Sequence, residues 1–279
     1  MFLGVSPAAA VTLVVDAPRS LEPIAMRIQS FDVAALSADL ARAGLAAPDR
    51  IRVTLIPESD ARAAEIPAWI VGLAFGASDL IIFPERVLPY PYDSLESVLR
   101  HEIAHLALSQ RAGSRPLPRW FHEGVAVSVD AGWDVSSRLQ LLLAMRRDPG
   151  LARLAELFAA GNHPDSALAY RLSAALISDI RRRHGPAVPG AIAARVSEGE
   201  PFDRAFERET SETPEAAAAQ AWAGYRQWTA WVSALTSDMM PWVIILVLAF
   251  VAFIARARQR ARRRRLWGDD IAGDEPLEG

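Results

Sequence analysis

The run His101-Glu102-Ile103-Ala104-His105 constrains the fold of this 279-residue chain more than any other feature of its sequence. The run lies in a stretch with the apolar spacing of a helix. Residues four apart on a helix lie on the same face, so both imidazoles can reach one metal ion. Glu102 lies beside them, where a carboxylate can hold and deprotonate a metal-bound water. A catalytic zinc takes three protein ligands and keeps one position open, so a third ligand must come from elsewhere in the chain.

The best candidate for the third ligand is Glu123, which lies in a second apolar segment at residues 119–130. We expect the first helix to begin at Asp93, the first residue of a capping-box pattern, and to end at Gly113. A short loop then allows the second helix to pack antiparallel, which brings Glu123 to the histidines. His122 is an alternative ligand, but it points about 100° away around the helix, so only one of the two can face the metal.

Two short motifs follow the histidine helix, Leu117-Pro118-Arg119-Trp120 and Glu123-Gly124-Val125-Ala126. With the His-Glu-x-x-His run they make the chain resemble the gluzincin metallopeptidases, most closely the peptidase MA-like proteins. The resemblance covers roughly residues 11–231. A surface helix with two solvated histidines is the alternative interpretation of the run.

The resemblance implies a ligand set and a fold. The zinc ligands would be His101, His105 and Glu123, with Glu102 as the general base. The fold would be α+β, with a small mixed sheet ahead of the motif helix and a helical lobe behind it. The strand near Leu80 would be the sheet edge that receives an extended substrate, although a plain structural hairpin explains that strand equally well.

The sequence departs from the family pattern at one position. Gluzincins often place an Asp one turn after the ligand Glu to orient a ligand histidine, and that position is Val127 here. Asp130 is a possible substitute, or simply an exposed residue at the helix end. The reaction also needs a group that stabilises the oxyanion, for which Tyr170 is the candidate; a tyrosine packed on a core helix is the alternative.

A second decisive feature is the uncharged apolar segment at residues 239–255, which we expect to form one transmembrane helix. By the positive-inside rule, the basic cluster after it stays in the cytoplasm, which leaves the preceding domain on the other side of a bacterial inner membrane. That cluster consists of Arg256, Arg258, Arg260, Arg262, Arg263, Arg264 and Arg265. The expected partners are therefore a lipid bilayer and a peptide or protein substrate, and no nucleic acid.

Residues 1–10 hold small residues suited to cleavage by a signal peptidase. They lack the basic region with which a signal peptide starts, so they resemble only its end. The expected domain organisation is a signal remnant at 1–10, a metallopeptidase-like domain at 11–237, the membrane helix at 239–255 and an Arg-rich segment with an acidic tail at 256–279. The chain has no Cys, so neither a disulfide framework nor a thiolate metal site is available.

The remaining pattern fits a single domain with strands first and helices after. Strands are expected at residues 11–15 and 51–56, with a helix at 21–43 between them, and a hairpin joins apolar segments 69–75 and 80–83. Helices are expected at 135–147, 151–160, 166–183, 188–197 and 202–209. A last helix begins at Thr213-Pro214, with Thr213 as the N-cap.

Two functions from different classes are compatible with these features. One is a membrane-anchored zinc endopeptidase that uses Glu102 as its base. The other is a membrane-anchored binding or assembly protein on a peptidase scaffold whose metal site is structural or inactive. Glu102 favours the enzyme, because a purely structural metal site does not need it.

Overall fold

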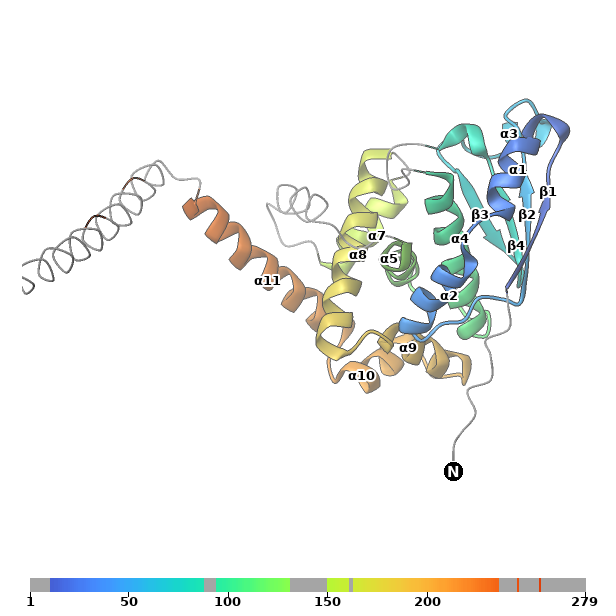
Figure 1. Ribbon diagram of the computed structural model, residues 1–279. Helices are drawn as coiled ribbons and strands as arrows, with labels where there is room; N and C mark the ends of the chain where they lie inside the picture. The colour runs from blue at the N-terminus through green and yellow to red at the C-terminus, as the bar shows by residue number, and fades with distance from the viewer. Residues whose placement is uncertain are drawn as a thin grey trace, which may run out of the picture. The chain divides into compact units, whose positions relative to one another are not determined.

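A computed structural model describes residues 11–87, 94–130, 150–160 and 163–235, together with Ile245 and Arg256. The chain divides into two compact units, Met1–Arg226 and Gln227–Gly279. The sheet, the helices up to α10 and the pocket described below all belong to the first unit, which is a mixed α+β domain (Figure 1).

The sheet has four strands in the order β1-β2-β4-β3. Strands β1 (Thr12–Asp16), β2 (Arg50–Leu55) and β4 (Asp79–Ile82) run parallel, and β3 (Gly72–Phe75) pairs antiparallel with β4. The expected hairpin between the last two strands is confirmed, and its turn begins at Gly76 with a positive φ of 62°. Gly suits that position because it has no Cβ to clash in the left-handed region.

The expectation that the strand near Leu80 forms the sheet edge is wrong. Strand β4 carries Leu80 and lies between β2 and β3, while β3 occupies the edge. Leu80 and Ile82 are fully buried as a result. The parallel pairing of β2 with β4 places the second arm of the hairpin inside the sheet.

The single helix expected at residues 21–43 is also wrong, because the structure has two helices there. Helix α1 (Glu22–Gln29) follows the short 3-10 helix η1 (Arg19–Leu21), and α2 (Val33–Arg42) begins after Asp32. The Asp32 side chain accepts a hydrogen bond of 3.0 Å from the Ala35 amide and so caps the second helix. The apolar spacing continues through the break, which is why periodicity alone did not reveal it.

The segment between β2 and β3 contains the short helix α3 (Ala61–Ala64), and β4 is followed by the 3-10 helix η2 (Pro84–Arg86). Arg86 is buried and forms a bidentate ion pair with Glu58, with nitrogen to oxygen distances of 2.7 and 2.9 Å. Its guanidinium also donates to the carbonyls of Ala63, Ile66, Pro67 and Ile70. This one side chain therefore holds the loop that leads into the edge strand.

The two motif helices are α4 (Leu95–Arg111) and α5 (Arg119–Asp130). Helix α4 is capped by Ser94, whose hydroxyl accepts a 3.1 Å hydrogen bond from the Ser97 amide, rather than by the expected Asp93, which lies outside the described residues. It ends as expected before Gly113, which has a φ of 62°. Helix α4 packs against β3 and β4 on one side and against α5 on the other (Figure 1).

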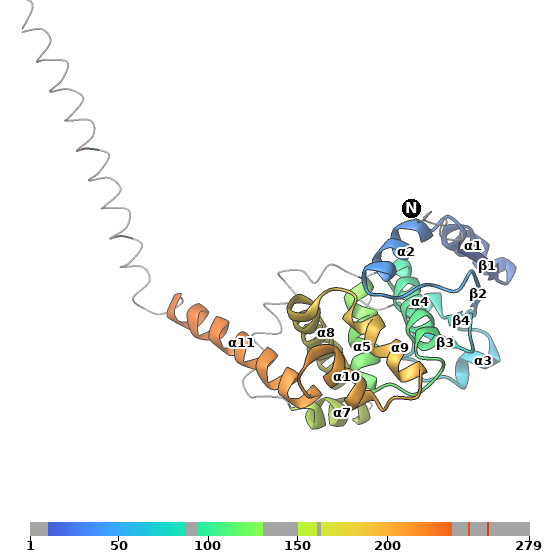
Figure 2. The same cartoon turned by 90° about the horizontal axis from the view of Figure 1, so that it is seen from below.

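The helical lobe contains α7 (Leu151–Ala159), α8 (His163–His184), α9 (Val188–Ser197), α10 (Phe202–Thr210) and α11 (Pro214–Leu235). The first four lie on the side of α4 that faces away from the sheet (Figures 1 and 2). These bounds agree closely with the expected helices, and the Thr213 hydroxyl caps α11 by accepting a 3.1 Å hydrogen bond from the Ala216 amide. The helix expected at residues 135–147 lies outside the described residues.

Trp120 and Gly124, from the two motifs, fix α5 within this lobe. The ring of Trp120 packs edge-on against Phe202 and Phe206 of α10, with centroids 6.0 and 6.3 Å apart. A Cβ built on Gly124 would lie 2.5 Å from the Ser173 carbonyl oxygen, so the absence of a side chain there lets α5 approach α8 closely. Both residues therefore have packing roles that orient the helix carrying Glu123.

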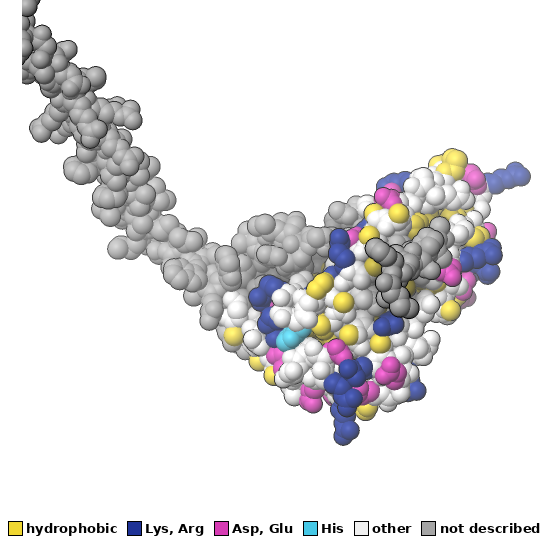
Figure 3. All heavy atoms as spheres, turned by 60° about the horizontal axis from the view of Figure 1, so that its bottom comes forward, with side chains coloured by type: hydrophobic (Ala, Val, Ile, Leu, Met, Phe, Trp, Pro, Cys, Tyr) yellow, Lys and Arg dark blue, Asp and Glu magenta, His cyan; other side chains and the backbone are white. Residues whose placement is uncertain are grey.

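The segment expected to span a membrane, residues 239–255, lies outside the described residues except for Ile245. Within the described part of the chain, no helix combines the length and apolar character needed to cross a bilayer. On the face of the first unit seen in Figure 3, Arg side chains are interspersed with Asp and Glu and do not gather into a single basic patch.

Candidate metal centre

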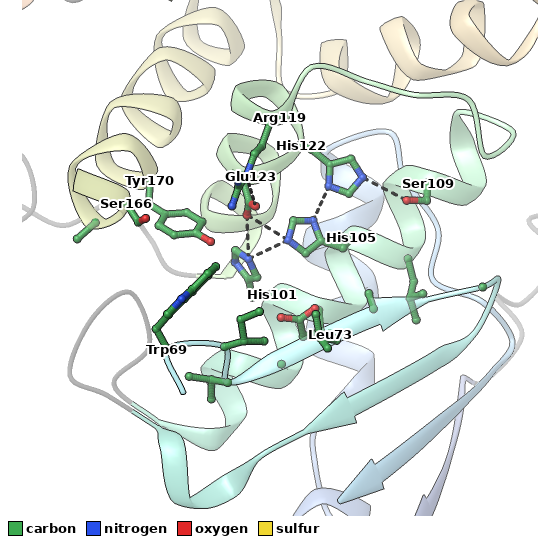
Figure 4. A pocket seen from close by; sticks show the side chains of 18 residues that line it. Trp69, Leu73, His101, His105, Ser109, Arg119, His122, Glu123, Ser166 and Tyr170 are labelled. Atoms are coloured by element: carbon green, nitrogen blue, oxygen red, sulfur yellow. Dashed lines mark hydrogen bonds and ion pairs between the residues drawn. The ribbon is translucent and has the colours of Figure 1, made fainter. Parts of the chain in front are cut away.

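His101, His105 and Glu123 converge at the contact between α4 and α5 (Figure 4). The Nε2 atoms of the two imidazoles lie 2.9 Å apart. Glu123 Oε2 lies 3.4 Å from His101 Nε2 and 3.2 Å from His105 Nε2. The contact between α4 and α5 is what brings the three side chains together. They form a largely buried group that can hold a metal ion.

The surroundings of Glu123 fit a cation. Its Oε2 atom is buried and has no partner in ordinary hydrogen-bond geometry among the described residues. Burying a carboxylate oxygen without a well-aligned hydrogen bond is costly, and a cation at the point where the imidazole nitrogens also converge would offset that cost. Burial raises the pKa of Glu123, but the facing imidazoles of His105 and His101 outweigh it and hold this pKa well below its usual range.

Glu102 points to the sheet side of α4 and is buried against the edge strand. A Cβ built on Gly72 of β3 would lie 2.7 Å from Glu102 Oε1, so the carboxyl group occupies the space that any other side chain at position 72 would fill. The Ala74 backbone amide also donates a hydrogen bond to it. Burial raises the pKa of Glu102 to about 7, against the opposing effect of the His105 charge.

His122 is not in the group that can hold a metal ion. Its Nδ1 atom lies 2.6 Å from His105 Nδ1, on the opposite side of the His105 ring from Nε2, and its Nε2 lies 3.2 Å from Ser109 Oγ (Figure 4). The His105 and His122 rings are stacked with centroids 4.5 Å apart. Burial, together with the His105 charge, lowers the pKa of His122 to about 3. The alternative of His122 as third ligand is therefore not the arrangement found.

Tyr170 extends from α8 toward the three candidate ligands (Figure 4). Its ring lies edge-on to His101, with centroids 6.2 Å apart, and edge-on to Phe158, with centroids 5.6 Å apart. Burial and the nearby Glu123 carboxylate raise the pKa of Tyr170 above its usual value, so its hydroxyl keeps its proton and can donate a hydrogen bond. Arg119 lies beside it, with its guanidinium over the Phe158 ring at 4.6 Å.

These side chains line one pocket of about 320 Å³. Strand β3 and the preceding loop form one wall, from Trp69 to Ala74, and α4, α5 and α8 form the others. Trp69 is 42% exposed at this wall, which is unusual for a tryptophan.

All the site residues expected from the sequence face this pocket: His101, Glu102, His105, Glu123 and Tyr170. The Asp130 side chain lies outside the described residues, so its expected role is not tested. Sequence reasoning missed the contributions of Gly72, Arg119 and Ser109. Gly72 carried a usable signal, since a glycine within a strand often marks the close approach of another group.

No protein-family model matches this chain, and no curated protein matches it either.

Proposed function

We propose that this chain is a zinc-dependent peptidase, anchored in a membrane by residues 239–255, that hydrolyses peptide bonds with Glu102 as general base. The observation that carries the proposal is the convergence of His101 Nε2, His105 Nε2 and Glu123 Oε2 beside a buried carboxyl group in an open pocket.

Zinc is the metal best suited to this donor set. Two imidazole nitrogens and one carboxylate oxygen make up a ligand set of known catalytic zinc sites, and three protein ligands leave a position open for water or substrate. The helix spacing of the two histidines and the position of Glu102 between them match the pattern in which the Glu acts as the base. When bound, zinc would act as a Lewis acid that lowers the pKa of a water molecule to near neutral and polarises a peptide carbonyl.

Glu102 and Tyr170 would carry out the other steps of the reaction. Glu102 takes a proton from the attacking water and passes it to the leaving amine. Its place against β3 puts it beside the edge strand, where an extended peptide can pair with the strand's backbone. Tyr170, which lines the same pocket, would donate a hydrogen bond to the carbonyl oxygen as negative charge develops on it.

The membrane anchor and the orientation of the domain are proposed from the sequence alone. The apolar segment at 239–255 and the arginines that follow it favour a helix with a cytoplasmic C-terminus and a pocket outside the cytoplasm of a bacterial cell.

Zinc content and peptide hydrolysis, measured on the same preparations of the whole chain, test the proposal. We expect about one zinc per chain in the wild type and in Glu102→Gln, and loss of zinc in Glu123→Ala. Hydrolysis of a mixed peptide pool is expected for the wild type and is expected to fall by about 10²-fold or more in Glu102→Gln. Gly150→Ala is the control, because a Cβ at that position meets nothing within 4 Å among the described residues.

Each outcome separates the two functions considered from the sequence. Zinc without hydrolysis, in both the wild type and Glu102→Gln, would favour a binding or assembly protein on this scaffold. A wild-type chain that holds no zinc would refute the proposal.

A further inference from the structure

His122 has a place in the site that the peptidase mechanism does not use. It lies on α5 directly before Glu123, yet its ring turns to the side of His105 that faces away from the other two candidate ligands. Three side chains form a row there: His105, His122 and Ser109 (Figure 4). The row begins and ends on α4 and passes through α5.

The 2.6 Å distance between His105 Nδ1 and His122 Nδ1 requires one proton between the two atoms. A neutral imidazole has one nitrogen that donates and one that accepts. If His105 donates from Nδ1, its Nε2 keeps a free lone pair. If His122 donates instead, the His105 proton must sit on Nε2, where it blocks metal binding.

The surroundings of His122 Nε2 are compatible with His105 as the donor. When Nδ1 of His122 accepts, its proton is on Nε2, which lies 3.2 Å from Ser109 Oγ. The serine hydroxyl oxygen can accept a hydrogen bond from that N–H group, so every ring nitrogen in the row has a role. Because His105 and Ser109 lie on α4 and His122 lies on α5, the row also connects the two motif helices.

We propose that His122 is a positioning residue that accepts a hydrogen bond from the Nδ1–H group of His105 and so keeps His105 Nε2 free for the metal, with Ser109 fixing the orientation of His122. The inference rests on the metal site of the proposed function but not on hydrolysis. It assigns to a neutral imidazole the role that a carboxylate or backbone carbonyl commonly takes behind a ligand histidine.

Zinc affinity, measured on the whole chain by competition with a chelator, tests this assignment. His122→Phe keeps a ring of similar shape but removes both nitrogens, and it is expected to weaken zinc binding about 10- to 100-fold while the stoichiometry stays the same. His122→Asn restores an acceptor and is expected to bind zinc within a few-fold of the wild type. His184→Phe is the control, because His184 lies at the end of α8 beside Glu212, and it is expected to leave the affinity unchanged.

A second measurement reports on the proton itself. Nitrogen NMR of labelled histidines in the metal-free chain distinguishes the two imidazole tautomers, and His105 is expected to carry its proton on Nδ1 in the wild type and in His122→Asn.

Three results would overturn the inference. The first is zinc affinity of His122→Phe within twofold of the wild type. The second is equal weakening by Phe and Asn, which would show that ring packing and not an acceptor matters. The third is complete loss of zinc in His122→Phe, as expected for Glu123→Ala, which would make His122 a ligand. A wild type that binds zinc but cleaves no peptide would refute the proposed peptidase and leave this inference intact, whereas a wild type without zinc would refute both.

Discussion

Gly72→Ala is expected to slow peptide hydrolysis without removing the metal. The added Cβ would lie 2.7 Å from Oε1, 2.8 Å from Cγ and 2.9 Å from Cδ of Glu102, whereas ordinary contacts of a Cβ begin near 3.4 Å. The atoms in the way belong to the end of a flexible side chain, so the carboxyl group moves more readily than the strand. The three atoms nearest to the new methyl group all belong to Glu102, and none belongs to a candidate metal ligand.

The size of the effect follows from that displacement. Restoring an ordinary contact requires the Glu102 carboxyl group to move by about 0.7 Å. A misplacement of about 1 Å can slow a reaction on the order of 10²-fold, because the reacting atoms leave the geometry that the barrier requires. We therefore expect kcat/KM to fall about 10- to 100-fold, which corresponds to about 1.4 to 2.7 kcal/mol of lost transition-state stabilisation.

The assay compares kcat/KM and zinc content for the wild type, Gly72→Ala and Gly150→Ala. The last variant makes the same chemical change where a Cβ meets nothing within 4 Å in the described part of the chain, and it is expected to behave as the wild type. Gly72→Ala with a rate within twofold of the wild type would show that the position of Glu102 against β3 does not matter for catalysis. Loss of zinc in this variant would show that the base and the metal ligands cannot be separated.

Three further outcomes are expected. Tyr170→Phe should keep its zinc and lose about 10²- to 10³-fold in kcat, measured with the same peptides; an unchanged kcat would leave Tyr170 a packing residue. Gly124→Ala should lower stability by about 1 to 3 kcal/mol, and the melting temperature by several degrees, because its Cβ meets the Ser173 carbonyl at 2.5 Å; an unchanged melting temperature would contradict this. In the metal-free chain, Glu102 has a pKa raised to about 7 from 4.5 by burial, so the folded state binds its proton more tightly than the unfolded state does. The free energy of unfolding should therefore fall by about 3 kcal/mol as pH rises from about 4.5 to 7. Denaturant titrations of Glu102→Gln should not show this fall. Parallel curves of stability against pH for the two proteins would refute the reasoning.

The parts of the site that could be predicted are those that depend on local spacing. The two histidines share a face of α4 because a helix repeats every 3.6 residues, and the segment with Glu123 is helical for the same reason. The short loop between these helices keeps them neighbours, and they pack against each other. The ligand group therefore follows from residues that are close in sequence.

The order of the strands could not be predicted in the same way. The hairpin of β3 and β4 is local, but the choice of which arm pairs with β2 depends on contacts between segments far apart in sequence. That choice decides whether Leu80 is buried inside the sheet or lies at its edge, and the consecutive apolar residues of β4 are compatible with both. The break at Asp32 is a different case, because an N-cap residue was present and the continuing apolar spacing concealed it.

The position of the His122 side chain could not be predicted from the sequence, for a geometric reason. Its angle on the helix predicts that it cannot face the metal together with Glu123, and His122 is not among the side chains that converge. It does not show where the side chain goes instead, because the Nδ1 of His105 and the Ser109 hydroxyl are presented by the other helix. Gly72 and Gly124 are similar cases, since the reason for a glycine becomes visible only with the group that occupies the space of its Cβ.

Metal affinity and the rate of hydrolysis should depend on different contacts within this site. The metal ligands are fixed by the contact between α4 and α5, whereas the Glu102 carboxyl group is fixed by the contact between α4 and the edge strand β3. Substitutions on the α5 side, at His122, should therefore change metal affinity first and the rate only through it. Substitutions on the strand side, at Gly72, should change the rate while the metal stays. A chain in which both sets of variants lose metal and activity together would have one rigid site rather than two independently supported parts.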